Sequence, residues 1–447
     1  MSFTTITAFI MVKRILQAAI VSFSCLQAVS GDANDTSLTQ SLNFEASFSD
    51  HPQPFSIKVD GEFIQATKQK ASQLRVAVDI NQDDFVDGVP SRILQNLSRH
   101  WSDEYDWRKV EAAMNEKFKQ FTTIVQAGEN YTHPIPLHFI HHRSERENVI
   151  PLLFLHGWPG SFHEVAGLID LLTSPPDPSL PAFHVVAPDL PGFGFSPAPR
   201  FPGLGLRDMG QAFDHLMQQL GYAKYVGQGG DFGSHTLRFM AADFPDSLVS
   251  ILSNLFSVAP SPDDIARFQN NQTTPEETIM FQFMNDPGLT WTQDYWAIES
   301  SVPLQVAIGM TDSPIAWTAW QYMGMRSLSP GYDWGIEELI TWSMLNYIQG
   351  PYGGLRLYKE AKREGTLAGA FPYVAQPVGV LNYYGDAAYY TPLDWAKRQG
   401  NITFFSKKAP EILGGHFPAH INPRSLAQDC WDFWGNSTIS GTEVFFH

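Results

Sequence analysis

A series of short apolar runs, separated by helix-forming stretches, constrains the fold of this chain more than any other feature. The run Val149–Leu155 is continuously apolar and ends in a Gly/Pro loop, as expected of a strand buried on both faces. Phe183–Asp189 is a second such run, and the pattern returns at Val378–Leu381 and Ile402–Phe405. Because short strands alternate with helices, we expect a mostly parallel, doubly wound sheet flanked by helices.

A further strand, at Tyr225–Val226, leads into the sequence GQGGDFG at Gly227–Gly233 and then into a helical run, Ser234–Phe244. Small residues on both sides of one reactive side chain are what the tight strand-to-helix turn of an α/β-hydrolase requires. The tip of the turn is Asp231, and the chain contains no Gly-x-Ser-x-Gly sequence. An aspartate between glycines is also common in ordinary turns, so the strand, turn and helix context supports its role as nucleophile.

An aspartate at this turn predicts a different reaction from that of a serine hydrolase. A carboxylate is already ionised at neutral pH and can displace at a saturated carbon, as in an epoxide or an alkyl halide. The product is an ester on the enzyme, whose carbonyl can then be attacked by water with an oxyanion hole in place. We expect that hole from the backbone N–H groups of Trp158 and of Phe232, which follows Asp231.

Hydrolysis of such an ester needs a base of near-neutral pKa, and in this fold the order along the chain is nucleophile, acid, histidine. His416 in Gly414–Phe417 follows the last expected strand, and Asp386 lies just past a strand end. We therefore expect Asp386 to orient a neutral His416. Asp394 is a less attractive acid because it begins an expected helix and is typical of an N-cap.

Four motifs together resemble the microsomal-type epoxide hydrolases, and the resemblance runs from about Pro54 to the C-terminus. They are WSDEYDWR at Trp101–Arg108, HGWPGSF at His156–Phe162, GGDFG at Gly229–Gly233 and GGHF at Gly414–Phe417. The resemblance implies that Tyr295 and Tyr358 donate hydrogen bonds to the epoxide oxygen, and it supports Asp386 as the acid. It also suggests that Trp158, Phe232 and Trp317 contact the substrate.

A phenol is chemically suited to that role, because it can protonate a developing alkoxide without being ionised at rest.

Three features depart from the family pattern. The segment after Tyr295 lacks the usual Lys-Pro pair, the spacing from Asp386 to His416 is slightly extended, and His420 follows Pro418 and Ala419. We expect these departures to bear on substrate range more than on chemistry.

The organisation along the chain predicts a two-part core with additions. Helix-forming sequence from Pro54 to about Ile140 predicts an N-terminal cap, and a Trp-, Met- and Pro-rich stretch predicts a helical lid. We divide the chain into a signal peptide (1–30), an N-terminal cap (31–148), the first core part (149–257), the lid (258–350) and the second core part (351–447).

The N-terminus predicts secretion. Lys13-Arg14 precedes an apolar run, Ile15–Leu26, and small residues follow at cleavage spacing. At about twelve residues this run is shorter than the roughly 20 that span a bilayer, so a retained anchor in the endoplasmic reticulum membrane is the alternative. The two cysteines, Cys25 and Cys430, neither support nor oppose secretion. Six sequons suit a secreted glycoprotein: Asn34, Asn96, Asn130, Asn271, Asn401 and Asn436.

The formal net charge of −17 disfavours nucleic acid and anionic lipid as partners. The 12 Trp and 32 Phe residues fit either a lipophilic pocket or simple filling of a large core. We expect a small lipophilic epoxide as substrate, no metal, no organic cofactor and no stable membrane anchor, and we leave a homodimer open. Two alternatives remain, namely a haloalkane dehalogenase and a catalytically silent secreted binding protein on the same scaffold.

Overall fold

The centre of the structure is a mixed sheet, seen in the part of the chain that the computed structural model describes, residues 42–80, 83–128, 130–286 and 290–446. Within these residues its strands lie in the order β1-β2-β3-β5-β4-β6-β7-β8-β9. They are β1 (Gln53–Phe55), β2 (Gln120–Val125), β3 (Ile135–His142), β4 (Ile150–Leu155), β5 (Phe183–Pro188), β6 (Tyr225–Gly229), β7 (Leu248–Ser253), β8 (Val374–Asn382) and β9 (Gly400–Lys407). The described residues fall in one compact unit, Thr39–His447. The expected signal peptide (1–30), Cys25 and Asn34 lie outside them.

Six neighbouring strands, β5-β4-β6-β7-β8-β9, pair in parallel, and β1, β2 and β3 extend the sheet from β5 by antiparallel pairing. The expected mostly parallel sheet of an α/β-hydrolase is therefore confirmed. Each apolar run singled out in the sequence forms a strand of the parallel part. Strands β4 and β5 are apolar because they are buried within the sheet, whereas β9 is an edge strand and is only partly buried.

The region before β4 differs from the expectation of helix up to about Ile140, because β2 and β3 are strands of the main sheet. Polar side chains in these strands concealed them. His138 of β3 is fully buried, and its Nδ1 lies 2.8 Å from an oxygen of Asp189. A buried polar side chain is tolerated when it is hydrogen-bonded, and that partner is supplied only by the folded chain.

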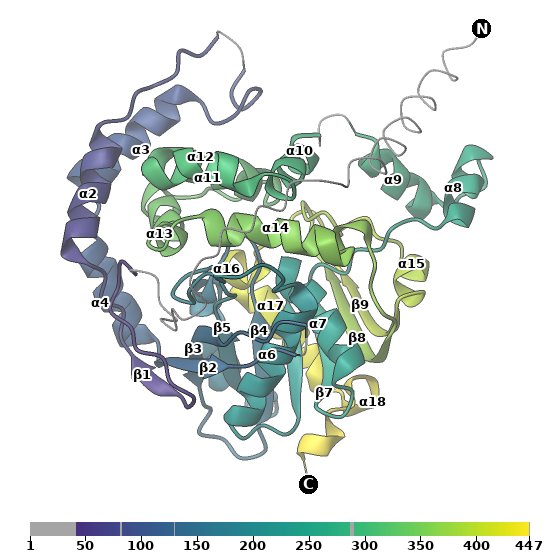
Figure 1. Ribbon diagram of the computed structural model, residues 1–447. Helices are drawn as coiled ribbons and strands as arrows, with labels where there is room; N and C mark the ends of the chain where they lie inside the picture. The colour runs from purple at the N-terminus through teal and green to yellow at the C-terminus, as the bar shows by residue number, and fades with distance from the viewer. Residues whose placement is uncertain (1–41, 81–82, 129, 287–289, 447) are drawn as a thin grey trace, which may run out of the picture. The chain divides into compact units, whose positions relative to one another are not determined.

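Three helices precede β2 and lie along one side of the molecule (Figure 1). They are α2 (Gly61–Ser72), α3 (Ser91–Asp103) and α4 (Trp107–Lys117). The aromatic residues of the WSDEYDWR run hold them in place, since Trp101 and Trp107 are each only 1% exposed. The side chain of Asp106 caps α4 by accepting from the backbone N–H of Arg108.

A further set of helices flanks the sheet. They are a 3₁₀ turn η1 (Phe162–Gly167), α5 (Ile169–Thr173), α6 (Leu206–Gln219), α7 (Asp231–Asp243), α15 (Leu393–Lys397), α16 (Pro418–Ile421), α17 (Pro423–Trp434) and α18 (Ser437–Ser440), with 3₁₀ turns η3 (Thr366–Ala368) and η4 (Thr442–Phe445). Helices α6 and α7 pack together on one face of the sheet, and α5 contacts α17 behind it (Figure 1).

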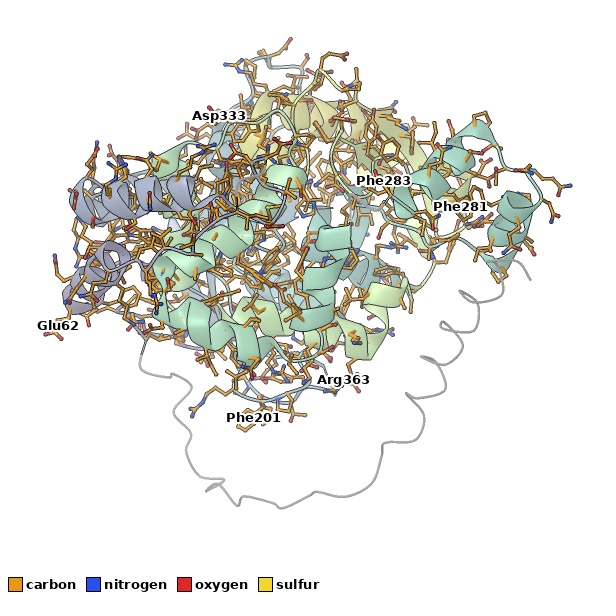
Figure 2. All side chains as sticks on the ribbon, turned by 90° about the horizontal axis from the view of Figure 1, so that it is seen from above. Glu62, Phe201, Phe281, Phe283, Asp333 and Arg363 are labelled. Atoms are coloured by element: carbon orange, nitrogen blue, oxygen red, sulfur yellow. The ribbon has the colours of Figure 1, made fainter. Side chains whose placement is uncertain are left out.

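Seven helices form an insertion between β7 and β8 in the described part of the chain. They are α8 (Pro262–Gln269), α9 (Pro275–Met284), α10 (Thr290–Glu299), α11 (Pro303–Asp312), α12 (Pro314–Ser327), α13 (Ile336–Tyr347) and α14 (Tyr352–Glu364). The sequence predicts an end of the lid at residue 350, whereas the helices between β7 and β8 continue through α14. Helices α10 to α14 lie over one end of the strands (Figure 1), and Figure 2 looks down on them with Glu62 of α2 and Phe281 of α9 at opposite sides.

Two further observations concern the described residues. None of their helices combines the length and the apolar character needed to span a bilayer. Cys430 is a buried free thiol in α17.

The turn from β6 into α7 is packed directly against the end of β4. Asp231 at its tip has a φ of 45°, a left-handed conformation that few side-chain-bearing residues adopt. A Cβ on Gly233 would lie 2.1 Å from the carbonyl oxygen of Leu155. The turn therefore requires a glycine at 233 to bring α7 close to β4.

We predict that Gly233→Ala lowers the free energy of unfolding by about 3 kcal/mol, because a backbone carbonyl cannot move aside as a side chain can. Denaturant unfolding followed by circular dichroism measures the change. Gly309→Ala in α11 is the matched control, since its Cβ would meet nothing within 4 Å. The control should raise stability by about 0.5 kcal/mol through helix propensity, and equal stabilities of the two variants would contradict the packing argument.

Candidate active site

Asp231 presents its carboxylate between a backbone donor and an imidazole. Its Oδ1 accepts a hydrogen bond of 2.8 Å from the backbone N–H of Trp158, and its Oδ2 lies 3.5 Å from Nε2 of His416. Burial alone would raise the pKa of this carboxyl group. The hydrogen bond and charge of His416, with the N–H of Trp158, instead hold the pKa below its usual value. Asp231 is therefore ionised at neutral pH, with 19% of its side chain exposed.

His416 lies between two carboxylates, with Nδ1 2.8 Å from Oδ2 of Asp386. The other oxygen of Asp386 accepts from the backbone N–H of Ala388 at 2.9 Å, which fixes the carboxylate. Burial by itself would lower the pKa of His416, but the charges of Asp386 and Asp231 outweigh it and raise the pKa to about 10. His416 is therefore an imidazolium when Asp231 carries its charge, whereas the sequence alone predicts a neutral ring.

Asp394, the competing acid, lies elsewhere. It is in the first turn of α15, and 88% of its side chain is exposed. Its ion-pair partner is Lys397, at 3.9 Å. The structure thus brings Asp386, and not Asp394, to the imidazole.

The loop from His156 to Gly160, called here the 156–160 loop, follows β4 and carries the donor to Asp231. Nδ1 of His156 donates to the carbonyl of Gly157 at 3.0 Å, and Nε2 accepts from the backbone N–H of Leu190 at 3.0 Å. These two bonds fix both the tautomer and the loop. Phe232, expected to give the second N–H, directly follows Asp231 in α7 and is 1% exposed.

Tyr295 of α10 and Tyr358 of α14 meet in the lid with their hydroxyl oxygens 3.3 Å apart. The ring of Tyr295 stacks on Trp158 at 5.1 Å, and the ring of Tyr358 meets Phe232 edge-on at 4.7 Å. Burial raises the pKa of both phenols above the usual range, so both are protonated. The structure brings two residues that are 63 positions apart to the same side of Trp158 and Phe232.

Trp317 lies behind this group. Its ring meets Trp158 edge-on at 6.5 Å, its indole N–H donates to the carbonyl of Ser343 at 3.2 Å, and it is 1% exposed. Trp158 lines the large cavity described next, whereas Trp317 and Phe232 are not among the described residues that line it. Trp317 supports Trp158 in this arrangement.

A cavity of about 700 Å³ extends from Trp158 and Tyr295 to the N-terminal helices. Its walls are mostly apolar and come from two parts of the chain. The segment around α2 and α3 contributes Leu74, Val76 and Leu94, and the lid contributes Ile298, Met310 and Met323. A cavity of this size and lining fits a small apolar ligand.

Two buried carboxyl groups near Asp231 were not expected from the sequence. Burial raises the pKa of Glu164 to about 8, and it raises the pKa of Glu299 well above its usual range. Glu299 accepts a hydrogen bond of 2.7 Å from the indole N–H of Trp320. Neither residue differs in sequence from a surface glutamate on a helix, so no local signal marked them.

Among the described residues, no group of three or more His, Cys, Asp or Glu side chains is arranged to hold a metal ion.

Comparisons with known proteins agree on one group. Residues 52–165 match the family model described as epoxide hydrolase N terminus, and residues 150–307 match that of the alpha/beta hydrolase fold. A Stigmatella aurantiaca protein, assigned to the epoxide hydrolases by its name, is 30% identical over 84% of this chain and 83% of its own length. The crystal structure of juvenile hormone epoxide hydrolase from the silkworm Bombyx mori has a TM-score of 0.75 and 26% identity, covering 87% of this chain and 94% of that one. The Aspergillus niger epoxide hydrolase gives 0.69 and 29%, over 87% and 97%.

We predict that Asp386→Asn lowers the pKa of His416 from about 10, because the larger of the two favourable charges is lost while burial remains. Two-dimensional NMR of the imidazole nitrogens over a pH titration measures this. In the wild type, the raised pKa of His416 contributes to the free energy of unfolding. This contribution is complete below pH about 6.5, the pKa of histidine in the unfolded chain, and it is lost as the pH rises through about 10, the pKa in the folded protein. Asp394→Asn is the control and should leave the titration unchanged. A wild-type midpoint near 6.5 would refute the charge arrangement.

Proposed function

Because this chain belongs to the epoxide hydrolase family, we propose that it hydrolyses an apolar epoxide to a vicinal diol through a covalent ester on Asp231. One observation carries the proposal. The ionised carboxylate of Asp231 lies between a backbone N–H donor and a histidine. Two protonated phenols lie nearby, with the ring of Tyr295 stacked on Trp158 and the ring of Tyr358 edge-on to Phe232. This set contains a nucleophile, a base and proton donors for a leaving oxygen.

In the first step a carboxylate oxygen of Asp231 attacks a ring carbon, and the bond from that carbon to the ring oxygen breaks. The alkoxide takes a proton from Tyr295 or Tyr358, whose buried phenols are protonated at rest. The imidazolium of His416 then returns a proton to the phenolate. This leaves a neutral ester at Asp231, a neutral imidazole and two phenols.

The second step depends on the change in charge that the first step makes. Esterification removes the charge of Asp231, which is one of the two that raise the pKa of His416. The pKa therefore falls, and the neutral ring can accept a proton from water. The hydroxide adds to the ester carbonyl, and the backbone N–H groups of Trp158 and Phe232 stabilise the oxyanion. Collapse expels the alkoxide, which takes the carboxyl proton and leaves as the diol.

The cavity supports an elongated, largely apolar substrate. It is lined by Trp158, whose backbone N–H donates to Asp231, by Tyr295, and by side chains of the lid and of the segment around α2 and α3. Several of the similar proteins, the silkworm structure among them, are named for juvenile hormone. For this chain we propose only the wider class of apolar epoxides. A panel of styrene oxide, stilbene oxide and long-chain 1,2-epoxyalkanes would identify the best substrate.

One observation favours a dehalogenase as the second candidate. The indole N–H of Trp158 is buried without a hydrogen-bond partner among the described residues, and an indole N–H can hold a halide. The facing pair of phenols favours the epoxide. Measuring halide release from haloalkanes beside diol formation from epoxides separates the two activities. Tight binding of the epoxide panel without turnover would instead support the silent binding protein.

We also propose that the chain is secreted after cleavage of a signal peptide at 1–30, that it is glycosylated, and that it forms a homodimer. The apolar run Ile15–Leu26 and the sequons support the first two. N-terminal sequencing of protein secreted by a eukaryotic host would show whether the leader is removed.

We predict that a single turnover in heavy-oxygen water leaves the label in the peptide containing Asp231 and not in the diol, because water attacks the ester carbonyl. Peptide mass spectrometry measures it, and the peptide containing Asp386 is the unlabelled control. His416→Gln should stop at the ester, visible as a mass increase of the intact protein. Label in the diol alone would exclude the covalent route.

We also predict that Tyr295→Phe and Tyr358→Phe each slow ester formation by about 100-fold, as expected for loss of a hydrogen-bond donor to developing charge. Rapid-quench mass spectrometry measures the rate of alkylation. Tyr347→Phe is the matched lid control, because its hydroxyl group donates to the carbonyl of Thr311 at 2.8 Å. Equal rates for all three variants would remove the two tyrosines from the mechanism.

A further inference from the structure

His420, which stood out in the sequence, connects the segment that carries the base to the lid. It lies in α16, four residues after His416, and its Nε2 donates to Oε1 of Glu338 in lid helix α13. Glu338 also accepts from the hydroxyl of Tyr332 at 2.7 Å and from the backbone N–H of Gly335 at 3.0 Å. Burial alone would raise the pKa of Glu338, but the hydrogen bonds from His420 and Tyr332 hold it below its usual value. The acceptor is therefore a carboxylate.

Aromatic packing fixes the imidazole of His420 in this position. The ring lies parallel to Trp334 at 5.6 Å and edge-on to Trp342 at 4.9 Å. Phe417, next to His416, meets the same two tryptophans at 5.8 and 5.3 Å. The loop that leads into α13 carries Trp334 next to Asp333, which Figure 2 labels. Both His420 and the residue following the base are thus packed against the lid.

The same face of α13 also holds the 156–160 loop. Glu338, Trp342 and Asn346 recur every four residues and so lie along one side of the helix. The side-chain N–H groups of Trp342 and Asn346 both donate to the carbonyl of Pro159, each at 2.8 Å. Pro159 follows Trp158, the donor to Asp231. One helix face therefore contacts the segment of the base and the segment of the oxyanion donor.

The second chemical step needs this connection most. Before alkylation, the negative charge of Asp231 attracts the ring of His416 across 3.5 Å. In the ester that charge is gone, just when the ring must hold a water molecule against the carbonyl. The remaining restraints include Asp386 at 2.8 Å, the backbone bond from the N–H of His416 to the carbonyl of Leu328 in the lid at 2.9 Å, the bond from the Asn254 amide to the carbonyl of His416 at 3.4 Å, and the attachment through α16. Small displacements of a base can cost large factors in rate.

We propose that His420 is a positioning residue for ester hydrolysis, and that its hydrogen bond to Glu338 keeps the His416 ring in register with the 156–160 loop. The inference rests on the proposed covalent function. It implies that the two chemical steps respond differently to loss of this bond. Ester formation, which draws on the charge of Asp231, proceeds as in the wild type, and ester hydrolysis becomes slower.

The test measures both steps with the best substrate of the epoxide panel. In His420→Ala, rapid quench and intact-protein mass spectrometry should show alkylation at the wild-type rate and hydrolysis about 10-fold slower. The kcat and KM values should fall together while the alkyl-enzyme accumulates. A cavity of about 330 Å³ lies beside His420 and Glu338, so added imidazole should restore hydrolysis.

Four further variants make the result decisive. Glu338→Ala should reproduce the loss, and the double variant should add little to it, as expected of two residues acting through one contact. If His420→Ala does not fold, Glu338→Gln decides, because it keeps the shape and weakens the bond. Glu337→Ala is the matched control on the same helix, since Glu337 faces His100 at 3.3 Å and its loss should leave both steps unchanged.

Two outcomes overturn the proposal. One is unchanged hydrolysis in the variants of His420 and Glu338, and the other is an equal slowing of both steps, which a general loss of lid structure would give. Failure of the covalent function is a separate result. In that case the wild type itself forms diol without an alkyl-enzyme and without heavy oxygen in Asp231.

Discussion

The structure of this site depends on one imidazolium held between two carboxylates. His416 lies 2.8 Å from Asp386 and 3.5 Å from Asp231, and their charges raise its pKa to about 10 despite burial. Each acid accepts a backbone N–H, Asp386 from Ala388 and Asp231 from Trp158, and Asp231 lies at the corner between β6 and α7. In the proposed reaction, esterification of Asp231 removes one of the two charges that raise the pKa of the histidine.

The lid provides more than a cover for this group. Its helices bring two protonated phenols to Trp158 and Phe232, and one face of α13 contacts both the 156–160 loop and α16. Because the lid is inserted between β7 and β8, its helices are tied to the sheet at both ends. The N-terminal helices complete the wall of the large cavity, so substrate size depends on two parts of the chain that are distant in sequence.

The chemistry and the substrate range have separate origins in this arrangement. The proposed nucleophile, acid and base, Asp231, Asp386 and His416, follow strands β6, β8 and β9 along the chain. Tyr295, Tyr358 and much of the cavity wall come from lid helices that pack largely through side chains. Such packing tolerates substitution better than strand pairing does. Two departures from the family pattern, after Tyr295 and at His420, lie in or against the lid. This location is consistent with substrate range varying with the lid while the residues that follow the strands stay the same.

The sequence by itself determined the parallel sheet and the turn at Asp231, because buried strands and tight turns impose local residue patterns. It also favoured Asp386 over Asp394 from the difference between a strand end and an N-cap. It did not reveal β2 and β3, the continuation of the lid through α14, the charge of His416 or the place of Trp317 behind Trp158. Those features depend on partners such as Asp189 for His138 and Glu338 for His420. Contacts of that kind arise only when residues far apart in the chain are buried together, so only the tertiary structure decided them.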